Sequence, residues 1–211
     1  MVICLMPVMA FAADEATATG ISQFSDADSI KNENKQAVAV LVGLGIIDGM
    51  GDGTFQPKGD LTRAQSSKLV ATLVKSGDKS DIPAPAADPF TDVSKGYWGA
   101  GAIQFGVDNG YINGMGDGTF HPEDQVTTAQ LATLLCKLLG FSVDDINYHW
   151  PENAMAKAND ELLLIDINKS ANEVLNREEA AQMIYNGLIA DMRVMTSTTG
   201  SDIDLVDGGR E

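Results

Sequence analysis

The segment GIIDGMGDGTFQP at residues 45–57 decides the architecture, because it returns as GYINGMGDGTFHP at residues 110–122. Between Gly45 and Gln65, 13 of 21 residues are identical to those found 65 places further along the chain. Such similarity at a fixed period is the mark of a duplicated structural unit. A weaker third copy is centred on LNREE at residues 175–179. The sequence therefore predicts three related units.

Each unit is predicted to hold a helix, a glycine loop and a second helix. Leucines at helical spacing over residues 131–139 form one apolar stripe in the second helix of the middle unit. Each second helix begins with an N-cap residue and a Gln or Glu three places later, the pattern of a capping box or a close variant: Thr62 with Gln65, Thr127 with Gln130, and Asn176 with Glu179. The loops pair glycines that tolerate positive φ with one anchoring Phe, whereas the third unit has a glycine-free segment at residues 165–172.

The ends and junctions of the chain have a different composition from the repeats. Residues 1–12, MVICLMPVMAFA, are uncharged and end in Ala-Phe-Ala, which is typical of a signal peptide, here without its basic start. Twelve apolar residues are too few to span a bilayer, so no membrane contact is predicted after the signal is removed. The predicted organisation is a signal at 1–12, units at 24–76, 90–141 and 146–190 (the third degenerate), a linker at 77–89, and at 191–211 a tail or tether to a further domain.

Charge and motif content exclude several functions. The 211 residues carry a formal charge of −16, which opposes nucleic-acid binding because that needs a basic footprint. The two His residues have no metal-pair spacing, and no phosphate loop, HExxH or nucleophile elbow occurs, so no enzyme activity and no cofactor are predicted. An EF-hand match beginning at Asp48 fails, because Met50 and Gly59 stand at ligand positions, so no metal is predicted. The abundant carboxylates leave a glycosidase pair open as an alternative.

Several of these motifs together resemble the S-layer homology repeat of bacterial surface proteins: FTDV at 90–93, YW at 97–98, GYING at 110–114, GDGTF at 116–120 and LTRAQ at 61–65. The resemblance covers about residues 24–190. It implies a mainly α fold in which three helix-loop-helix repeats pack as a pseudo-threefold bundle. It also implies grooves between repeats that bind secondary cell-wall polysaccharide, commonly pyruvylated, and so hold the protein on the envelope.

The resemblance also implies site residues. The Arg of the family's Thr-Arg-Ala-Glu motif matches Arg63 and Arg177, whereas the middle unit has Thr128. The Glu of that motif matches Gln65 and Gln130 in the first two units, and the family's Trp matches Trp98 and Trp150.

Physical chemistry supports Arg63 separately. A cation in the first turn of a helix opposes the macrodipole at a cost of roughly 0.3–1 kcal/mol, so a ligand carboxylate would explain it. Amides at the helix start, and those of the loops at Gly51 and Gly116, would add donors, while Trp98 and Trp150 would offer stacking faces. The alternatives are that the arginines pair with surface carboxylates and that the tryptophans fill gaps between helices.

The sequence thus predicts an exported module of the cell wall and surface layer whose partner is an anionic cell-wall polysaccharide. Arg63, Arg177, Trp98, Trp150, Gly51, Gly116, Gln65 and Gln130 are the predicted ligand-binding residues. One alternative is a lattice protein that self-associates in a surface layer through protein contacts. A less favoured one is a hydrolase of wall glycan.

Overall fold

The computed structural model describes residues 20–77 and 82–196, which are helical with irregular loops. The predicted signal at 1–12, part of the linker and the last 15 residues of the predicted tail lie outside these ranges. The described helices are η1 Ala27–Ser29, α2 Asn32–Gly43, α3 Arg63–Val74, α4 Ala100–Asp108, α5 Thr128–Leu138, α6 Val143–Asn147, α7 Glu152–Asp160 and α8 Arg177–Thr196. The mainly α prediction is confirmed.

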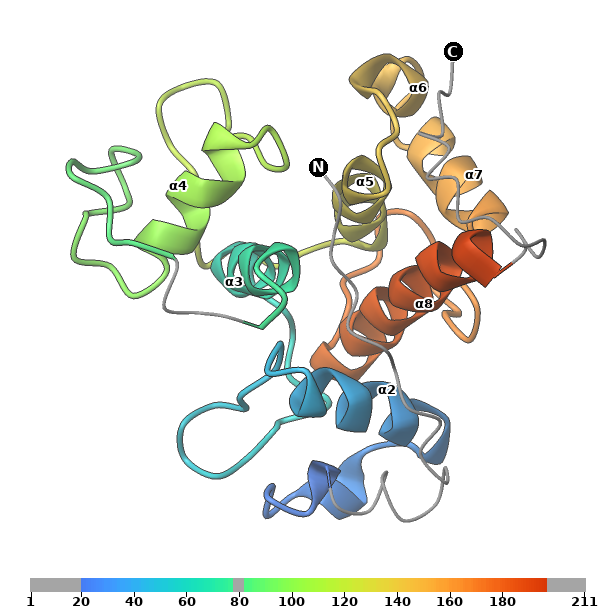
Figure 1. Cartoon of the computed structure of the whole chain (residues 1–211). Coiled ribbons are helices and arrows are strands. Elements are labelled where there is room, and N and C mark those ends of the chain that lie inside the picture. The colour runs from blue at the N-terminus through green and yellow to red at the C-terminus, as the bar shows by residue number, and fades with distance from the viewer. Residues whose placement is uncertain (1–19, 78–81, 197–211) are drawn as a thin grey trace.

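The helices pair between units rather than within them. The second helix of each unit packs against the first helix of the next, so α3 lies on α4 and α5 lies on α7. The second helix of the third unit, α8, returns to α2 of the first unit and closes the cycle. Figure 1 shows this arrangement, with α2, α4 and α7 placed outside α8, α3 and α5.

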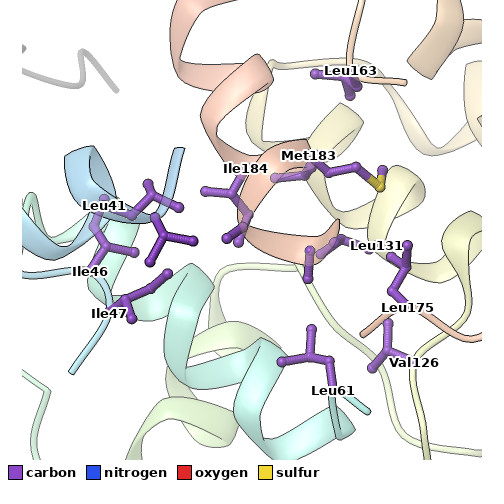
Figure 2. Packing of buried hydrophobic residues seen from close by; sticks show 14 of the residues in the cluster. Leu41, Ile46, Ile47, Leu61, Val126, Leu131, Leu163, Leu175, Met183 and Ile184 are labelled. Carbon is purple, nitrogen blue, oxygen red and sulfur yellow. The ribbon is translucent and has the colours of Figure 1, made fainter. Parts of the chain in front are cut away.

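A ring of backbone hydrogen bonds joins the three units just before their second helices. Leu61 N donates to Leu175 O at 3.0 Å, Leu175 N donates to Val126 O at 3.0 Å, and Val126 N donates to Leu61 O at 2.8 Å. The three side chains are buried and lie together in the shared core, which Figure 2 shows. Each unit therefore satisfies its neighbour's backbone, and the units form one pseudo-threefold bundle.

The predicted helix starts are confirmed in all three units. Thr62 and Thr127 form complete capping boxes with Gln65 and Gln130. In the third unit, Glu179 N donates to Asn176 Oδ1 at 2.9 Å, while Asn176 N donates to Glu179 Oε2 at 3.1 Å. These reciprocal bonds satisfy donors that a helix leaves unpaired at its N-terminus.

The glycine loops are fixed to their own units by an aspartate and a phenylalanine. In the second unit, Asp92 accepts hydrogen bonds from Phe120 N and His121 N, both at 2.8 Å, and in the first unit Asp26 binds the corresponding amides of residues 55 and 56 at the same distance. His121 has a φ of 58°, in the left-handed region that disfavours residues with a side chain. The aspartate and the buried Phe120 together hold this strained turn in place.

Two details go beyond the sequence prediction. Helix α8 continues to Thr196, beyond the expected end of the third unit at residue 190. A short helix, α6, fills the junction before the third unit, where Ser142 and Asp145 form a capping box. Cys136 is fully buried in the core, and burial raises the pKa of its thiol to about 12. Within the described ranges, no helix is long and apolar enough to cross a bilayer.

Candidate functional site

A cavity of about 180 Å³ lies between α3 and α5 and receives side chains from all three units. Its polar residues are Arg63, Ser66 and Ser67 of the first unit, Tyr111, Asn113, Gln130, Thr133 and Lys137 of the second, and Trp150 at the entry to α7. None of the described residues that line it is acidic. In a chain with a formal charge of −16, this cavity is a local site of positive charge.

Arg63 lies across the boundary between the first and second units. Its Nε donates to Phe120 O at 2.9 Å, and one of its terminal nitrogens donates to Asn113 O at 3.1 Å. The guanidinium carbon lies 4.4 Å from the centre of the Phe120 ring, within cation–π range. Burial lowers the pKa of Arg63, and the nearby carboxylates of Asp124 and Asp92 oppose that shift. The guanidinium is therefore held by two carbonyls and an aromatic face at the cavity wall.

Lys137 and Trp150 complete the polar lining. Lys137 Nζ donates to Gly110 O at 3.3 Å and to Tyr111 O at 3.4 Å, and burial lowers the pKa of its ammonium group. Trp150 Nε1 donates to Thr133 Oγ1 at 3.0 Å, although the side chain as a whole is 45% exposed. Two cations and a partly exposed indole face thus share one cavity, which suits a sugar that carries a carboxylate.

The sequence predicts that the helix-start amides bind a ligand, but in the structure they are already hydrogen-bonded within the protein. Arg63 N donates to Asp124 O and Ala64 N donates to Pro122 O, both at 2.9 Å, while Gln65 N is bound by its cap. At the start of α8, Arg177 N donates to Gly59 O at 2.9 Å. Contacts with the neighbouring unit and the helix cap therefore already occupy these donors.

The other two boundaries repeat this construction with different residues. Arg177 Nε donates to Phe55 O at 2.7 Å, and its guanidinium lies 5.1 Å from the Phe55 ring centre. Between the second and third units, Thr128 stands at the arginine position and its hydroxyl donates to Glu173 O at 3.1 Å. Both arginines therefore contact the glycine loop of the next unit rather than surface carboxylates.

The predicted site residues do not all come together. Arg63, Gln130 and Trp150 share the cavity, whereas Arg177 lies at the boundary between the third and first units. Trp98 lies outside the cavity at the entry to α4, where it is 56% exposed and its ring is tilted against that of Tyr97. Gln65 serves in a capping box. Gly51 and Gly116 lie at exposed loop tips away from the cavity, with φ of 84° and 90°.

Sequence reasoning missed Lys137 and Thr133 as cavity residues. Both residues lie on α5 beside the apolar stripe of that helix. The residue that corresponds to Thr133 in the first unit is Lys68, and the one that corresponds to Lys137 is Thr72, so the repeated pattern does not mark these positions. The aspartates that fix the loops had a usable signal, because Phe-Ser-Asp at 24–26 and Phe-Thr-Asp at 90–92 precede both glycine loops.

The sequences of known proteins match two of the three units to one family. The S-layer homology domain matches residues 23–65 and 89–132. The chain is 29% identical over 179 residues to a cell surface protein of Thermoanaerobacter kivui, covering 84% of this chain and 23% of the relative. It is 30% identical over 186 residues to the middle cell wall protein of Brevibacillus brevis, covering 87% and 17%. An amylopullulanase of Thermoanaerobacterium thermosulfurigenes is 27% identical over 195 residues, covering 80% and 10%.

The chain thus spans less than a quarter of the length of each of these relatives, and the proteins that share it differ in kind. The third unit lies outside the matched residues, yet it has the same capped second helix and the same place in the backbone ring. The first and second units are thus S-layer homology domains, and a divergent third copy of the same construction closes the bundle.

Proposed function

We propose that this chain anchors a surface protein to the bacterial envelope by binding an anionic cell-wall polysaccharide in the cavity between α3 and α5. The observation that carries the proposal is the convergence of Arg63, Lys137 and Trp150 from three units on one cavity without acidic lining residues. The names of the relatives, a cell surface protein and a middle cell wall protein, support a location at the cell surface.

The chemistry assigns a part to each residue. Lys137 and the terminal nitrogens of Arg63 attract a sugar carboxylate, such as that of a pyruvate ketal, while Trp150 packs against the face of the sugar ring. Gln130 lines the same wall, where its side chain is oriented by the capping box. The chain needs no catalytic group for this role, and the match to an amylopullulanase is consistent with one anchoring module serving both enzymes and structural proteins.

Arg177 gives the boundary between the third and first units a similar guanidinium, so we propose it as part of a second, weaker contact with the same polymer. Two weak sites on one rigid body raise retention through effective concentration. Trp98 lies on the outer surface, where it can contact the same polysaccharide beyond the cavity.

The test is sedimentation of the protein with purified cell walls before and after the secondary polysaccharide is removed. Lys137→Gln should weaken binding about tenfold or more, because it removes a charged contact to the ligand. The matched control is Lys95→Gln, an exposed lysine outside the cavity. Equal binding to stripped walls, or equal losses in both variants, would refute polysaccharide recognition. Self-association without wall binding would instead favour a lattice protein.

A further inference from the structure

The sequence contains three Asn-Gly pairs, at residues 109–110, 113–114 and 186–187. In such a pair the backbone nitrogen of the glycine can attack the side-chain carbonyl of the asparagine, because glycine has no Cβ to hinder the approach. The attack needs a glycine nitrogen that is not engaged in a hydrogen bond and an asparagine side chain that can turn toward it. The structure separates the three pairs by these conditions.

Two of the pairs are held by helical hydrogen bonds. At the end of α4, Asn109 Nδ2 donates to Phe105 O at 2.8 Å. The next amide, Gly110 N, donates to Val107 O at 3.0 Å. Asn186 is buried within α8, where its Nδ2 donates to two carbonyls at 3.0 and 2.8 Å and helical bonds hold the amide that follows. Attack at either pair therefore requires local unfolding.

The third pair, Asn113 and Gly114, lies in the glycine loop of the second unit, and Asn113 is exposed. Within the described residues, neither the Asn113 side chain nor the Gly114 N–H has a hydrogen-bond partner. Arg63 donates to the backbone oxygen of Asn113 at 3.1 Å. This guanidinium withdraws electron density from the peptide bond between residues 113 and 114, which favours the loss of the Gly114 proton that the attack requires.

Packing requires glycine at position 114. A Cβ there would lie 2.3 Å from a ring carbon of Phe90 and 2.8 Å from Thr119 O. The first unit has the same constraint, because a Cβ on Gly49 would lie 2.6 Å from a ring carbon of Phe24. The fold therefore retains the glycine in both loops, and the residue before it determines whether the loop can react.

In the first unit that preceding residue is already an aspartate, Asp48. Its carboxylate lies 3.6 Å from Lys68 Nζ on α3, whereas the second unit has Thr133 at the place of Lys68. A carboxylate at residue 113 is thus compatible with the loop, but α5 has no lysine at the corresponding place to neutralise it. Asn113 also lines the cavity between α3 and α5, where none of the described lining residues is acidic.

We propose that Asn113 is a site of spontaneous deamidation, and that the reaction weakens the attraction of this cavity for an anionic polymer. Gly114 N forms a bond to Asn113 Cγ, the Cγ–Nδ2 bond breaks, and ammonia leaves with the proton from Gly114 N. Water then opens the cyclic imide at either carbonyl and leaves an aspartate or an isoaspartate. Either product adds a negative charge next to Arg63. The modification is independent of the function proposed above, whereas its effect on binding rests on that function.

The modification is measured by incubating the full chain in heavy-oxygen water and analysing its peptides by mass spectrometry. Heavy oxygen enters only when the imide opens during the incubation, so conversion during later handling is not counted. Asn113 should convert about tenfold faster than Asn109 and Asn186, because only those two pairs require local unfolding. In urea that unfolds the chain, the three rates should become similar. Equal rates in the folded protein would overturn the proposal.

The effect on binding is measured by sedimentation with cell walls. Asn113→Asp should weaken binding about tenfold, because its carboxylate competes with that of the sugar for the cations of the cavity. Asn172→Asp makes the same charge change at an exposed residue outside the cavity and should have little effect. During the incubation the original chain should lose binding, whereas Asn113→Gln should keep its starting affinity, since glutamine forms a cyclic imide far more slowly.

The two assays separate this inference from the proposed function. If Asn113→Asp binds walls as tightly as the original chain while Lys137→Gln does not, the inferred effect on the cavity is wrong and the polysaccharide site stands. If the original chain does not bind walls at all, the proposed function fails, while selective entry of heavy oxygen at Asn113 still establishes the modification.

Discussion

Replacing Arg63 with methionine tests whether this residue holds two repeats together as well as lining the cavity. Methionine keeps much of the length and apolar stem of arginine but lacks the guanidinium. The structure assigns that group two hydrogen bonds, to Phe120 O at 2.9 Å and to Asn113 O at 3.1 Å, and a ring contact at 4.4 Å. All three link α3 to the loop of the next unit.

The magnitude follows from these contacts. Each hydrogen bond contributes about 0.5–1.5 kcal/mol net, and the half-buried cation–π contact about 0.5–1 kcal/mol. Arg63→Met should therefore lower the free energy of unfolding by about 2–3 kcal/mol, because the contacts share one side chain and are not fully additive. Arg177→Met should cost slightly less, since it loses one such hydrogen bond and a ring contact at 5.1 Å.

Urea unfolding followed by circular dichroism at helical wavelengths measures both changes, with Lys95→Met as the matched control. The expected order of loss is Arg63, then Arg177, with the exposed Lys95 near zero. If Arg63→Met unfolds at the same urea concentration as Lys95→Met, the boundary contacts contribute nothing and the argument for a structural role of the arginines is refuted.

Four further predictions concern single contacts. Thr127→Ala should lower the free energy of unfolding by about 1 kcal/mol through loss of a capping box, measured by urea unfolding against Ser94→Ala on the surface. Lys58→Met should lower the free energy of unfolding by about 1–3 kcal/mol, because the fully buried carboxylate of Glu178 is paired with Lys58 and accepts a hydrogen bond from Lys31 N at 2.9 Å. A loss as small as that of Lys95→Met in the same urea assay would contradict this. Burial raises the pKa of Asp92, but hydrogen bonds from Phe120 N and His121 N outweigh it and hold that pKa below its usual value of 3.8. The stabilisation of the fold by this carboxylate is therefore complete above about pH 4 and is lost as pH falls through the lower folded-state pKa. Asp92→Asn should lose less stability over that pH range in an acid-unfolding measurement, and a profile equal to that of the unchanged protein would refute the assignment. Thr128→Arg should destabilise the bundle, whereas Thr128→Arg combined with Lys169→Phe should recover part of the loss in the same urea assay, and no recovery would count against a coupled exchange.

The local parts of the fold could be predicted because local chemistry determines them. Thr62 and Thr127 define helix starts through a pattern confined to four residues, and Phe55 and Phe120 are the aromatic residues of their glycine loops. The cyclic pairing of helices has no such local signal, since contacts between α2 and α8 join residues more than a hundred positions apart. The resemblance to a family supplied that part of the prediction.

The site was predictable only in part for the same reason. Arg63 stood out because a cation is unfavourable in the first turn of a helix. Lys137 gave no such signal, because a lysine near a helix C-terminus is ordinary and is made significant only by the neighbouring unit across the cavity. The expected helix-start amides failed on a tertiary contact, since the carbonyl of Asp124, from the next unit, already accepts from the first amide of α3.

The boundary between the second and third units shows how the repeats diverged. Ala129 N donates to Ala171 O at 3.0 Å, as Ala64 N donates to Pro122 O at 2.9 Å in the boundary before it. This shared contact aligns Ala171 with Pro122. Phe120 lies two residues before Pro122, so the residue at its place in the third unit is Lys169.

Thr128 at the arginine position and Lys169 at the phenylalanine position therefore belong to the same boundary. An arginine at Thr128 would meet an ammonium group instead of an aromatic face, and like charges repel. Lys169 instead donates to Val174 O at 3.2 Å and pairs with Glu179 at 3.6 Å, while Thr128 donates to Glu173 O. This boundary thus closes the bundle with short polar contacts and keeps no guanidinium at its arginine position for a ligand. Because closure at this boundary rests on these polar contacts, the second unit can hold Thr128 where the first and third units hold an arginine without losing its place in the fold.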